Sequence, residues 1–467
     1  MSRMSVSTWC GAAAGAALTV IAPHVVQAES LESALIQAYQ SNPSLNSQRA
    51  SVRAIDEGVP QALAGYRPRI TATASAGEQY TDTRTKLSSG TSPYQNLAGF
   101  YAPSSYGVTS TQTLFNGFQT ANRTRQAEAT VFAARETLRT TEQNVLLSAV
   151  TAYMNLLRDT AILDLQKRNV EVLQEQLRQI RDRFNVGEVT RTDVAQSESR
   201  IAAGRSQVLT AEANYKTSAA IYRQVIGNEA GKLSAGTPVD RFSPTNLSGA
   251  VASGNAQHPT VLAAQYNVDT AEYQVKVAEG ALLPTLSLNT TFSKTYQTTQ
   301  SALESMTGSV IGQLSVPIYQ GGAEYSAVRQ AKETLGQRRI DLDTSRDQAR
   351  QTVVQSWGLL EAAKGNIQAT QSQVQAAEVA LNGVREEARV GQRTTLDVLN
   401  AQQELVNARV ALVGAQRDRV VASYTLLAAV GRLSPQILGL RVPTYDSQVH
   451  YHQVRDSWFG LRTPDGR

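Results

Sequence analysis

Cysteine is nearly absent from this sequence and histidine is scarce: there is one Cys and there are four His among 467 residues. Cys10 and His24 both lie within the first 28 residues, so only His258, His450 and His452 remain downstream. The sequence contains no H-E-x-x-H motif and no cysteine pair, which argues against zinc hydrolysis, disulfide scaffolds and thiolate metal sites. No recognisable pairing of a nucleophile with a base is present. We therefore expect no enzyme activity, no cofactor and no metal.

Charged residues are also few. They make up 18% of the chain, against about 25% in average soluble domains, and the formal net charge is +5. No run of five like charges occurs, so the basic balance indicates a solvated surface and no nucleic-acid partner is expected. The segment Gly227 to Leu233 is the nearest approach to a phosphate-binding loop, but it has no hydroxyl at the position that would bind Mg²⁺, and it is interpreted as a turn.

Long apolar runs are missing as well. The chain has no apolar stretch of the roughly 18 residues that would predict a transmembrane helix. The stretch from Trp9 to Ile21 is shorter, follows Arg3 and precedes the small-residue site at Ala28. This pattern predicts a secretory signal peptide over residues 1–28.

The remaining sequence contains an internal repeat in two copies. At an offset of 204 residues, Leu114 to Gly117 falls on Ile318 to Gly321, Gly187 falls on Gly391, and Gly227 falls on Gly431. Upstream the offset is 216, so the first copy has 12 extra residues, which we place in an exposed loop within Tyr80 to Ser105. The predicted organisation is a first repeat at 29–228, a linker at 229–246, a second repeat at 247–432 and an extended tail at 433–467.

Each copy is predicted to begin with a helix that ends before a proline, over Leu31 to Gly65 and Leu247 to Gly280. Two strands rich in Thr, Ser and aromatic residues follow each helix. Their predicted ranges are Arg69 to Tyr80 and Tyr106 to Phe115 in the first copy, and Thr285 to Tyr296 and Ser309 to Ile318 in the second. Leu286, Leu288 and Phe292 alternate with polar residues, which is typical of a strand with one apolar face. The lengths match the roughly 9 to 11 residues with which a tilted strand crosses a membrane.

Very long helices are predicted after the strands. No proline occurs from Ser104 to Thr237 or from Ile318 to Ser434, and no glycine occurs from Phe118 to Val186. At 1.5 Å per residue, that last interval alone allows roughly 100 Å of helix. Near its end the apolar spacing becomes that of a coiled coil. The seam residues are Val170, Leu173, Leu177, Ile180 and Phe184, with Val374, Ala377, Leu381, Val384 and Ala388 in the second copy.

Both long helices, which we call the rods, are predicted to end in glycine turns where the chain reverses direction. These turns are Phe184 to Asp193 and Ala388 to Asp397. Gly187 and Gly391 suit the left-handed residue that follows a helix. Thr190 with Asp193, and Thr394 with Asp397, have the spacing of a capping box that opens a return helix. The return helices are expected to run to Gly227 and Gly431.

Four membrane strands cannot close a barrel, and an open edge in lipid leaves backbone groups unpaired at several kcal/mol each. Several copies must therefore pool their strands. Two copies would give 8 strands, whose interior is filled by side chains, whereas three give 12 strands and room for a lumen. The predicted fold is mixed α and β: a trimeric 12-stranded transmembrane β-barrel, with four strands per chain, continuous with a long α-helical coiled-coil tunnel in the periplasm.

The combination resembles the TolC family of outer-membrane channels over residues 30–432. The resemblance rests on the signal peptide, the double repeat, the strand ends L-F-N-G and I-Y-Q-G-G, and the V-G-x-x-T turns that begin at Val186 and Val390. It implies an outer-membrane homotrimer, in contact with lipid, that works with a periplasmic adaptor protein and an inner-membrane pump of the RND or ABC type. Such a channel exports small toxic compounds or secreted polypeptides, and the sequence leaves that choice open.

The same resemblance implies roles for residues at the turns. Adaptor docking would fall on the turn residues Val186, Gly187, Thr190, Val390, Gly391 and Thr394. A periplasmic gate would fall on Arg393, Asp193 and Asp397, with Arg393 tied to an Asp of the neighbouring turn. Two positions depart from the family pattern: Ala388 stands where the best-known member has a tyrosine, and Asn400 stands at an acidic ring position. The resting state is therefore expected to have fewer polar links.

Other interpretations remain open at this point. Asp193 and Asp397 could serve only as helix caps, and the turn glycines could serve only the hairpins. Tyr80, Phe100, Tyr106 and Tyr296 could form an aromatic girdle at a membrane interface or be ordinary strand residues. The tail at 433–467 could be an extended strip on the outside of the tunnel or disordered. The rival to the channel is a secreted coiled-coil structural or adhesin fibre.

Overall fold

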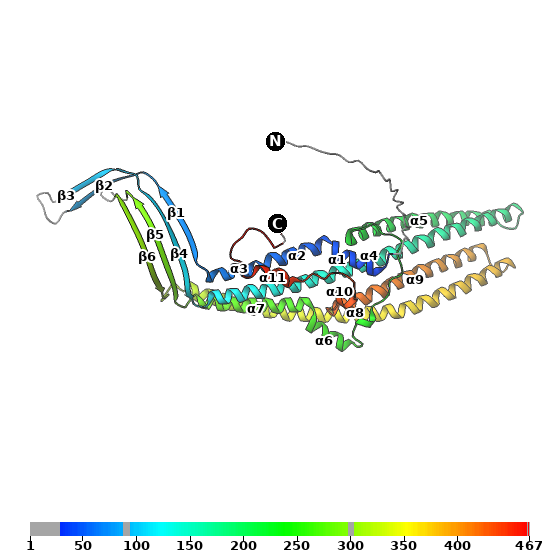
Figure 1. The fold of residues 1–467 in the computed structure, drawn as a ribbon. Coiled ribbons are helices and arrows are strands. Elements are labelled where there is room, and N and C mark those ends of the chain that lie inside the picture. The colour runs from blue at the N-terminus through cyan, green and yellow to red at the C-terminus, as the bar shows by residue number, and fades with distance from the viewer. Residues whose placement is uncertain (1–28, 87–93, 298–302, 465, 467) are drawn as a thin grey trace, which may run out of the picture.

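In a computed structural model of the protein, residues 29–86, 94–297, 303–464 and 466 are described. The predicted signal peptide, with Cys10 and His24, lies outside this part of the chain. The molecule is elongated, with a sheet at one end and two helical hairpins reaching to the other (Figure 1). Among the described residues, no helix combines the length and the apolar content needed to cross a membrane.

The four-stranded sheet has the order β1-β4-β5-β6, and every neighbouring pair is antiparallel. Its strands are β1 (Arg69–Ala76), β4 (Ser104–Asn116), β5 (Thr285–Tyr296) and β6 (Glu304–Ser315). The four predicted strands are thus present, with shifted ends. β6 begins and ends earlier than predicted. Its end precedes Pro317, which has no backbone N–H to continue the ladder. In the described part of the chain, β1 and β6 each lack a partner on their outer edge.

The loop expected at Tyr80 to Ser105 is largely a second sheet, and that expectation was wrong in part. β2 (Gln79–Lys86) and β3 (Tyr94–Tyr101) pair antiparallel and extend beyond the four strands (Figure 1). β2 carries Thr81, Thr83 and Thr85 in alternation, and β-branched residues favour the extended backbone. Tyr80 and Phe100 pack against each other here, with ring centroids 5.0 Å apart.

The helix predicted before each sheet pair is broken at a proline. The first copy has α1 (Leu31–Ser41), α2 (Pro43–Asp56) and α3 (Gly58–Leu63), and the second has α6 (Leu247–Gln257) and α7 (Pro259–Gly280). Pro43 and Pro259 force the preceding residues, Asn42 and His258, into an extended backbone with ψ of 120° and 124°. Each of these residues then caps the next helix by accepting a hydrogen bond two residues on, from Ser44 N at 3.0 Å and Thr260 N at 3.2 Å.

The long rods are present as predicted. α4 (Gln119–Asn185) and α8 (Ala323–Arg389) each contain 67 residues, roughly 100 Å of helix. The return helices are α5 (Arg191–Ile226) and α9 (Thr395–Ala429). α4 packs against α2 and α7, and α7 packs against α8. The helices thus lie side by side in the order of the strands to which they are joined, β1, β4, β5 and β6.

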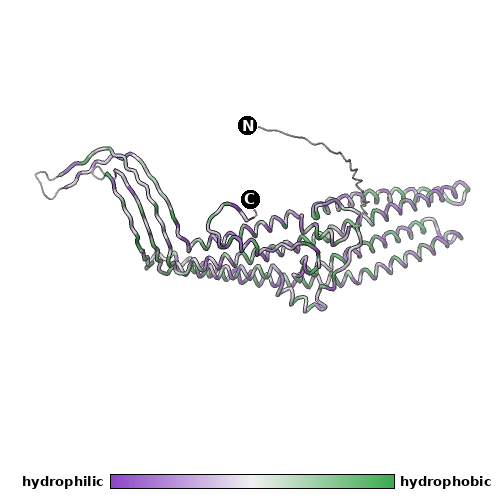
Figure 2. Tube along the Cα trace, viewed as in Figure 1, coloured by the Kyte–Doolittle hydropathy of each residue, from purple (hydrophilic) through white to green (hydrophobic). Residues whose placement is uncertain are grey.

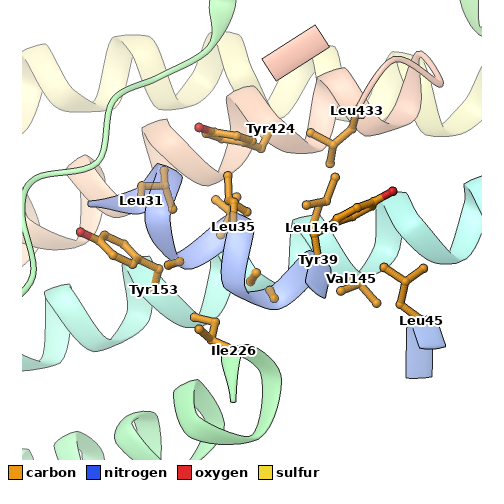
Figure 3. Packing of buried hydrophobic residues seen from close by; sticks show 14 of the residues in the cluster. Leu31, Leu35, Tyr39, Leu45, Val145, Leu146, Tyr153, Ile226, Tyr424 and Leu433 are labelled. Carbon is orange, nitrogen blue, oxygen red and sulfur yellow. The ribbon is translucent and has the colours of Figure 1, made fainter. Parts of the chain in front are cut away.

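Polar and apolar residues are interleaved along the rods, with no continuous apolar band (Figure 2). The main core lies between α1 and the helices α4, α5 and α9 (Figure 3), at mid-length of the molecule (Figure 1). There Leu35 and Tyr39 of α1 meet Leu146 of α4 and Tyr424 of α9, all nearly inaccessible to solvent. This core joins the two repeats and positions the hairpins that extend beyond it.

The tail at 433–467 was predicted to be extended or disordered, and this was wrong for part of it. It contains the short helix α10 (Pro435–Leu438) and the helix α11 (Ser447–Val454). α11 lies against α2, and its buried residues His450 and Val454 are four apart on one face. A helix of two turns offers only this one repeat of the period, which is why the sequence pattern did not reveal it.

Candidate functional site

The two hairpin tips, where α4 turns into α5 and α8 turns into α9, lie at the same end of the molecule (Figure 1). They contain all the residues predicted for docking and gating. Each rod ends in a left-handed glycine, Gly187 with φ of 82° and Gly391 with φ of 80°. The backbone N–H after each glycine donates to a carbonyl of the rod, Glu188 N to Arg183 O and Gln392 N to Glu387 O, both at 2.9 Å. These bonds close the helix ends in the manner of a Schellman motif.

Both return helices open with the predicted capping box. Asp193 N donates to Thr190 Oγ1 at 3.3 Å, and Thr190 N donates to Asp193 Oδ2 at 2.9 Å. In the second repeat, Asp397 N donates to Thr394 Oγ1 at 3.3 Å, and Thr394 N donates to Asp397 Oδ2 at 3.0 Å. The donated hydrogen bonds from the Thr394 backbone and hydroxyl lower the pKa of Asp397. The capping role of both aspartates is therefore confirmed, while their gating role stays a prediction.

Arg393 has a partner within its own hairpin that the resemblance did not imply, while its role in the gate stays a prediction. Its Nε lies 2.8 Å from Glu387 Oε2, in the last turn of the rod that precedes it, and this partner raises the pKa of Arg393. In the first repeat, Arg183 pairs with Glu188 at 3.0 Å across the same kind of turn. Sequence reasoning missed both pairs. The signal was the presence of opposite charges five or six residues apart across a predicted turn, where a hairpin brings them together.

An apolar residue is exposed at the end of each rod. Val186 is 73% exposed and Val390 is 72% exposed, although valine normally avoids such contact with water. Nothing lies within 4 Å of a Cβ placed on Gly187 or Gly391. The tips are thus exposed and apolar at their apex, which suits docking by a partner protein.

The hairpins are joined a short distance from the tips. Leu399 of α9 packs with Leu173 of α4 and Ile201 of α5. Nearby, Arg200 Nη2 donates to Asn400 Oδ1 at 2.6 Å, which links the two return helices. The departure at Asn400 therefore has a structural consequence, because this position bridges the two hairpins. Leu173 belongs to the predicted seam of the first copy. Its contact with Leu399, in the return helix of the second copy, could not be predicted from the spacing within one copy.

A cavity of about 600 Å³ separates the hairpins between this joint and the tips. α4 lines one side with Val172, Gln176 and Ile180, and Arg385 and Ala388 of α8 line the other. Ala388 thus faces open space where a larger side chain would fill the gap. The free ends of the hairpins are thus separated here, beyond the joint at Leu399.

Within the described residues, no group of three or more His, Cys, Asp or Glu side chains is arranged to hold a metal ion. His450 and His452 lie in α11 at the other side of the core, with His450 Nδ1 at 3.0 Å from Asp56 Oδ2. The chemistry available at the tips is that of apolar contact, hydrogen bonding and ion pairing.

Comparison with known proteins places this geometry in context. A family model described as outer membrane efflux protein matches residues 34–228 and 253–432. The chain is 43% identical over 450 residues to the outer membrane efflux protein BepC of Brucella suis, which covers 96% of this chain and 95% of BepC. It is 28% identical over 429 residues to the outer membrane protein TolC of Escherichia coli, covering 88% and 84% of the two chains. Among solved structures, the CmeC outer membrane channel of Campylobacter jejuni is similar with a TM-score of 0.77 and 17% identity, covering 91% of this chain and 89% of CmeC.

Proposed function

Because the chain belongs to the outer membrane efflux protein family, we propose that three copies assemble into one channel that crosses the outer membrane and continues as a tunnel through the periplasm. The observation that carries this proposal is the open sheet. β1 and β6 lack outer partners in the described chain, and the strands are joined in order to helices that lie side by side. Three such strips close a barrel of 12 strands and, below it, a tube.

The channel resides in the outer membrane, and its work is export. We propose that it exports small toxic compounds, because the relative at 43% identity is named an efflux protein. The similarity to that relative extends over nearly its whole length. An inner-membrane pump of the RND or ABC type would supply the energy, with a periplasmic adaptor protein docked on the tips. The chain itself would carry out no reaction. The fibre interpretation finds no support in the family match, which covers both repeats.

The proposal gives each predicted segment of the chain a role. Residues 1–28 would direct secretion and be removed, and the repeats at 29–228 and 247–432 would each supply two barrel strands and one hairpin. The linker at 229–246 crosses the core, where Val239 is buried against the end of α9. Docking is assigned to the apex residues, among which Val186 and Val390 expose the apolar surface that an adaptor would cover.

Trimer assembly can be tested through the two open edges. A cysteine at Thr73 in β1 combined with cysteines scanned along β6, at Ser309, Ile311 and Gln313, is expected to give disulfide-linked trimers on mild oxidation. Cysteines on neighbouring strands lie within the roughly 4.4 to 6.8 Å between Cα atoms that a disulfide needs. Gel electrophoresis under denaturing conditions without reductant reads the result.

The control pairs the same Thr73→Cys with Thr291→Cys in β5, a strand already flanked by β4 and β6. This pair should remain uncrosslinked. Disulfides that form within one chain, giving no species larger than a monomer, would contradict the proposal that identical copies complete the barrel.

The gate can be tested by conductance. Arg393→Gln together with Asp193→Asn is expected to raise the conductance of the channel in planar bilayers, because both changes remove charge that would hold neighbouring tips together. Asn at position 193 keeps an oxygen that can accept from Thr190 N, so the helix cap is retained.

Glu387→Gln is the matched control, since Glu387 is the partner of Arg393 within one hairpin. If Arg393 acts across to another tip, loss of Glu387 should leave the resting conductance unchanged. Equal effects of Glu387→Gln and Arg393→Gln would assign the arginine to hairpin structure and remove it from the gate.

A further inference from the structure

Near the C-terminus, three large apolar side chains are mostly exposed in the part of the chain that the structure describes. Trp458 is 65% exposed, Phe459 is 92% exposed and Leu461 is fully exposed. Arg455 and Arg462, both exposed, flank the three residues. We call residues 458–461 the apolar tip of the tail. Single exposed apolar residues are common on proteins, but three within four positions indicate a surface that contacts something apolar.

The tail is fixed to the protein at successive points that lead toward the sheet. Tyr445 N donates to the hydroxyl of Tyr39 at 3.1 Å. His450 Nδ1 then lies 3.0 Å from the buried carboxylate of Asp56, near the end of α2. Arg67 Nη1 finally donates to Ser457 O at 2.6 Å. The apolar tip is thus held at a defined place on the protein.

That place is the junction between helices and strands. The guanidinium carbon of Arg67 lies 4.7 Å from the centre of the Trp458 ring. Only Pro68 separates Arg67 from the first residue of β1, Arg69, so this part of the backbone is within about 7 Å of the strand's start. β4 and β5 contain 13 and 12 residues, somewhat more than the roughly 9 to 11 that cross a bilayer, so the strand ends fall at the membrane surfaces.

The side chains of the apolar tip suit the level of the lipid headgroups. Tryptophan is enriched where lipid headgroups meet the acyl chains, since its ring is apolar and its N–H can stay hydrated. Arginine beside it pairs with anionic headgroups. The same junction exposes Tyr66, Phe118 and Tyr319, which are close in sequence to the ends of β1, β4 and β6. Of the girdle residues expected from the sequence, Tyr106 and Tyr296 lie at the opposite ends of β4 and β5, and Tyr80 and Phe100 lie in the second sheet. This level was therefore missed.

The tail helix α11 lies over α2 and α4, on one face of the helical layer. α11 packs on α2, and the ring of Tyr451 in α11 lies 5.2 Å from the guanidinium carbon of Arg135 in α4. Neighbouring copies join at the layer's edges, beside α2 and α8. A tail on the inner face would obstruct the bore with three copies of itself, which places it on the outside, facing lipid at the barrel's base.

We propose that the apolar tip of the tail inserts into the periplasmic leaflet of the outer membrane and anchors the base of the barrel to the lipid headgroup layer. The partner is a phospholipid surface, contacted by Trp458, Phe459 and Leu461 and balanced by the adjacent arginines. This inference rests on the proposed function, because it takes the sheet as the membrane-spanning part.

Tryptophan fluorescence tests the contact directly, because Trp357 and Trp458 are the only tryptophans after the predicted signal peptide. Trp357 lies 34 residues into α8, roughly 50 Å from the barrel end of that helix, and provides an internal control. The full chain carrying Trp357→Phe is reconstituted in phosphatidylethanolamine and phosphatidylglycerol vesicles that contain phosphatidylcholine brominated near the headgroup end of its acyl chains. Emission from Trp458 is expected to fall roughly twofold relative to unbrominated vesicles, as for an aromatic residue at the interface.

The reciprocal variant, Trp458→Phe, keeps Trp357 and should show no quenching. If Trp357→Phe fails to fold, wild type and Trp458→Phe can be compared directly. The fraction of wild-type emission that is quenched should then be absent in Trp458→Phe. Conductance of the same vesicles is measured in parallel. Unquenched Trp458 in conducting vesicles would overturn the lipid contact alone, for example because a neighbouring copy covers the ring. Vesicles with neither trimers nor conductance would overturn the proposed function and the lipid contact together.

Discussion

Replacing both turn glycines with valine, Gly187→Val and Gly391→Val, is expected to abolish export while the trimer still assembles in the membrane. Both residues have φ near 80°, a region that costs a residue with a Cβ roughly 1–2 kcal/mol and is least tolerated by β-branched side chains. The strain would break the closing bonds from Glu188 N and Gln392 N and splay the tips. The barrel is unaffected because rods of 67 residues, roughly 100 Å, separate it from the tips.

The measurement is export from a strain lacking its own copy, with any compound to which that deletion confers hypersensitivity. A drop of at least about tenfold in export corresponds to the loss of roughly 1.4 kcal/mol or more in docking affinity. Photo-crosslinking from the tips to periplasmic proteins should be lost in parallel. Full export by the double variant would show that the turns need only be helical hairpins of any geometry and would remove them from docking.

Gly383→Ala is the matched control for this experiment. Gly383 lies in α8, about two turns before Gly391. It has no positive φ, and no atom lies within 4 Å of a Cβ placed on it. Alanine is the better helix former by about 1 kcal/mol, so export and assembly should be retained. A loss of export in this variant would mean that any change near the tips disturbs the channel.

The rods and tips were predictable because their determinants are local. A helix of 67 residues follows from the absence of glycine and proline, and Thr190 with Asp193 defines a cap by spacing alone. The four predicted strands, together with the repeat, then predicted the class of fold. Where a local rule was applied too loosely, the prediction failed: Pro43 and Pro259 end one helix and start the next, yet each region was taken as one helix.

Other features depend on contacts between distant parts of the chain. His450 is buried against Asp56, nearly 400 residues away, and no pattern in the tail reveals that α2 is its partner. The link from Arg200 to Asn400 joins two hairpins that only the folded core places side by side. The hairpin of β2 and β3 lies in the segment that breaks the repeat, so comparison of the two copies could not define it.

One further titratable group was not identified from the sequence, the carboxyl of Glu142 in α4. Burial raises the pKa of this carboxyl to about 7, against an ordinary value of 4.5, and the charges of Arg49 and Arg139 offset only part of that effect. Below pH 4.5 the carboxyl is neutral in both folded and unfolded chains, so the folded state has its full stability. As pH rises toward 7, the unfolded chain releases its proton while the folded chain retains it, and stability falls by about 3 kcal/mol per chain once both are ionised.

Glu142→Gln is therefore expected to stabilise the helical region at pH 8 and to leave it unchanged at pH 4. Glutamine has nearly the same shape but never bears the charge that burial disfavours, so the dependence on pH between about 4.5 and 7 should be reduced. Thermal unfolding followed by circular dichroism at several pH values should show a midpoint several degrees higher at pH 8, since each kcal/mol corresponds to a few degrees in a domain of this kind. Glu171→Gln, at an exposed position of the same helix, should give the wild-type profile. A destabilised Glu142→Gln at pH 8 would mean that attraction to the charges of Arg49 and Arg139 outweighs desolvation, and that the core depends on this charge.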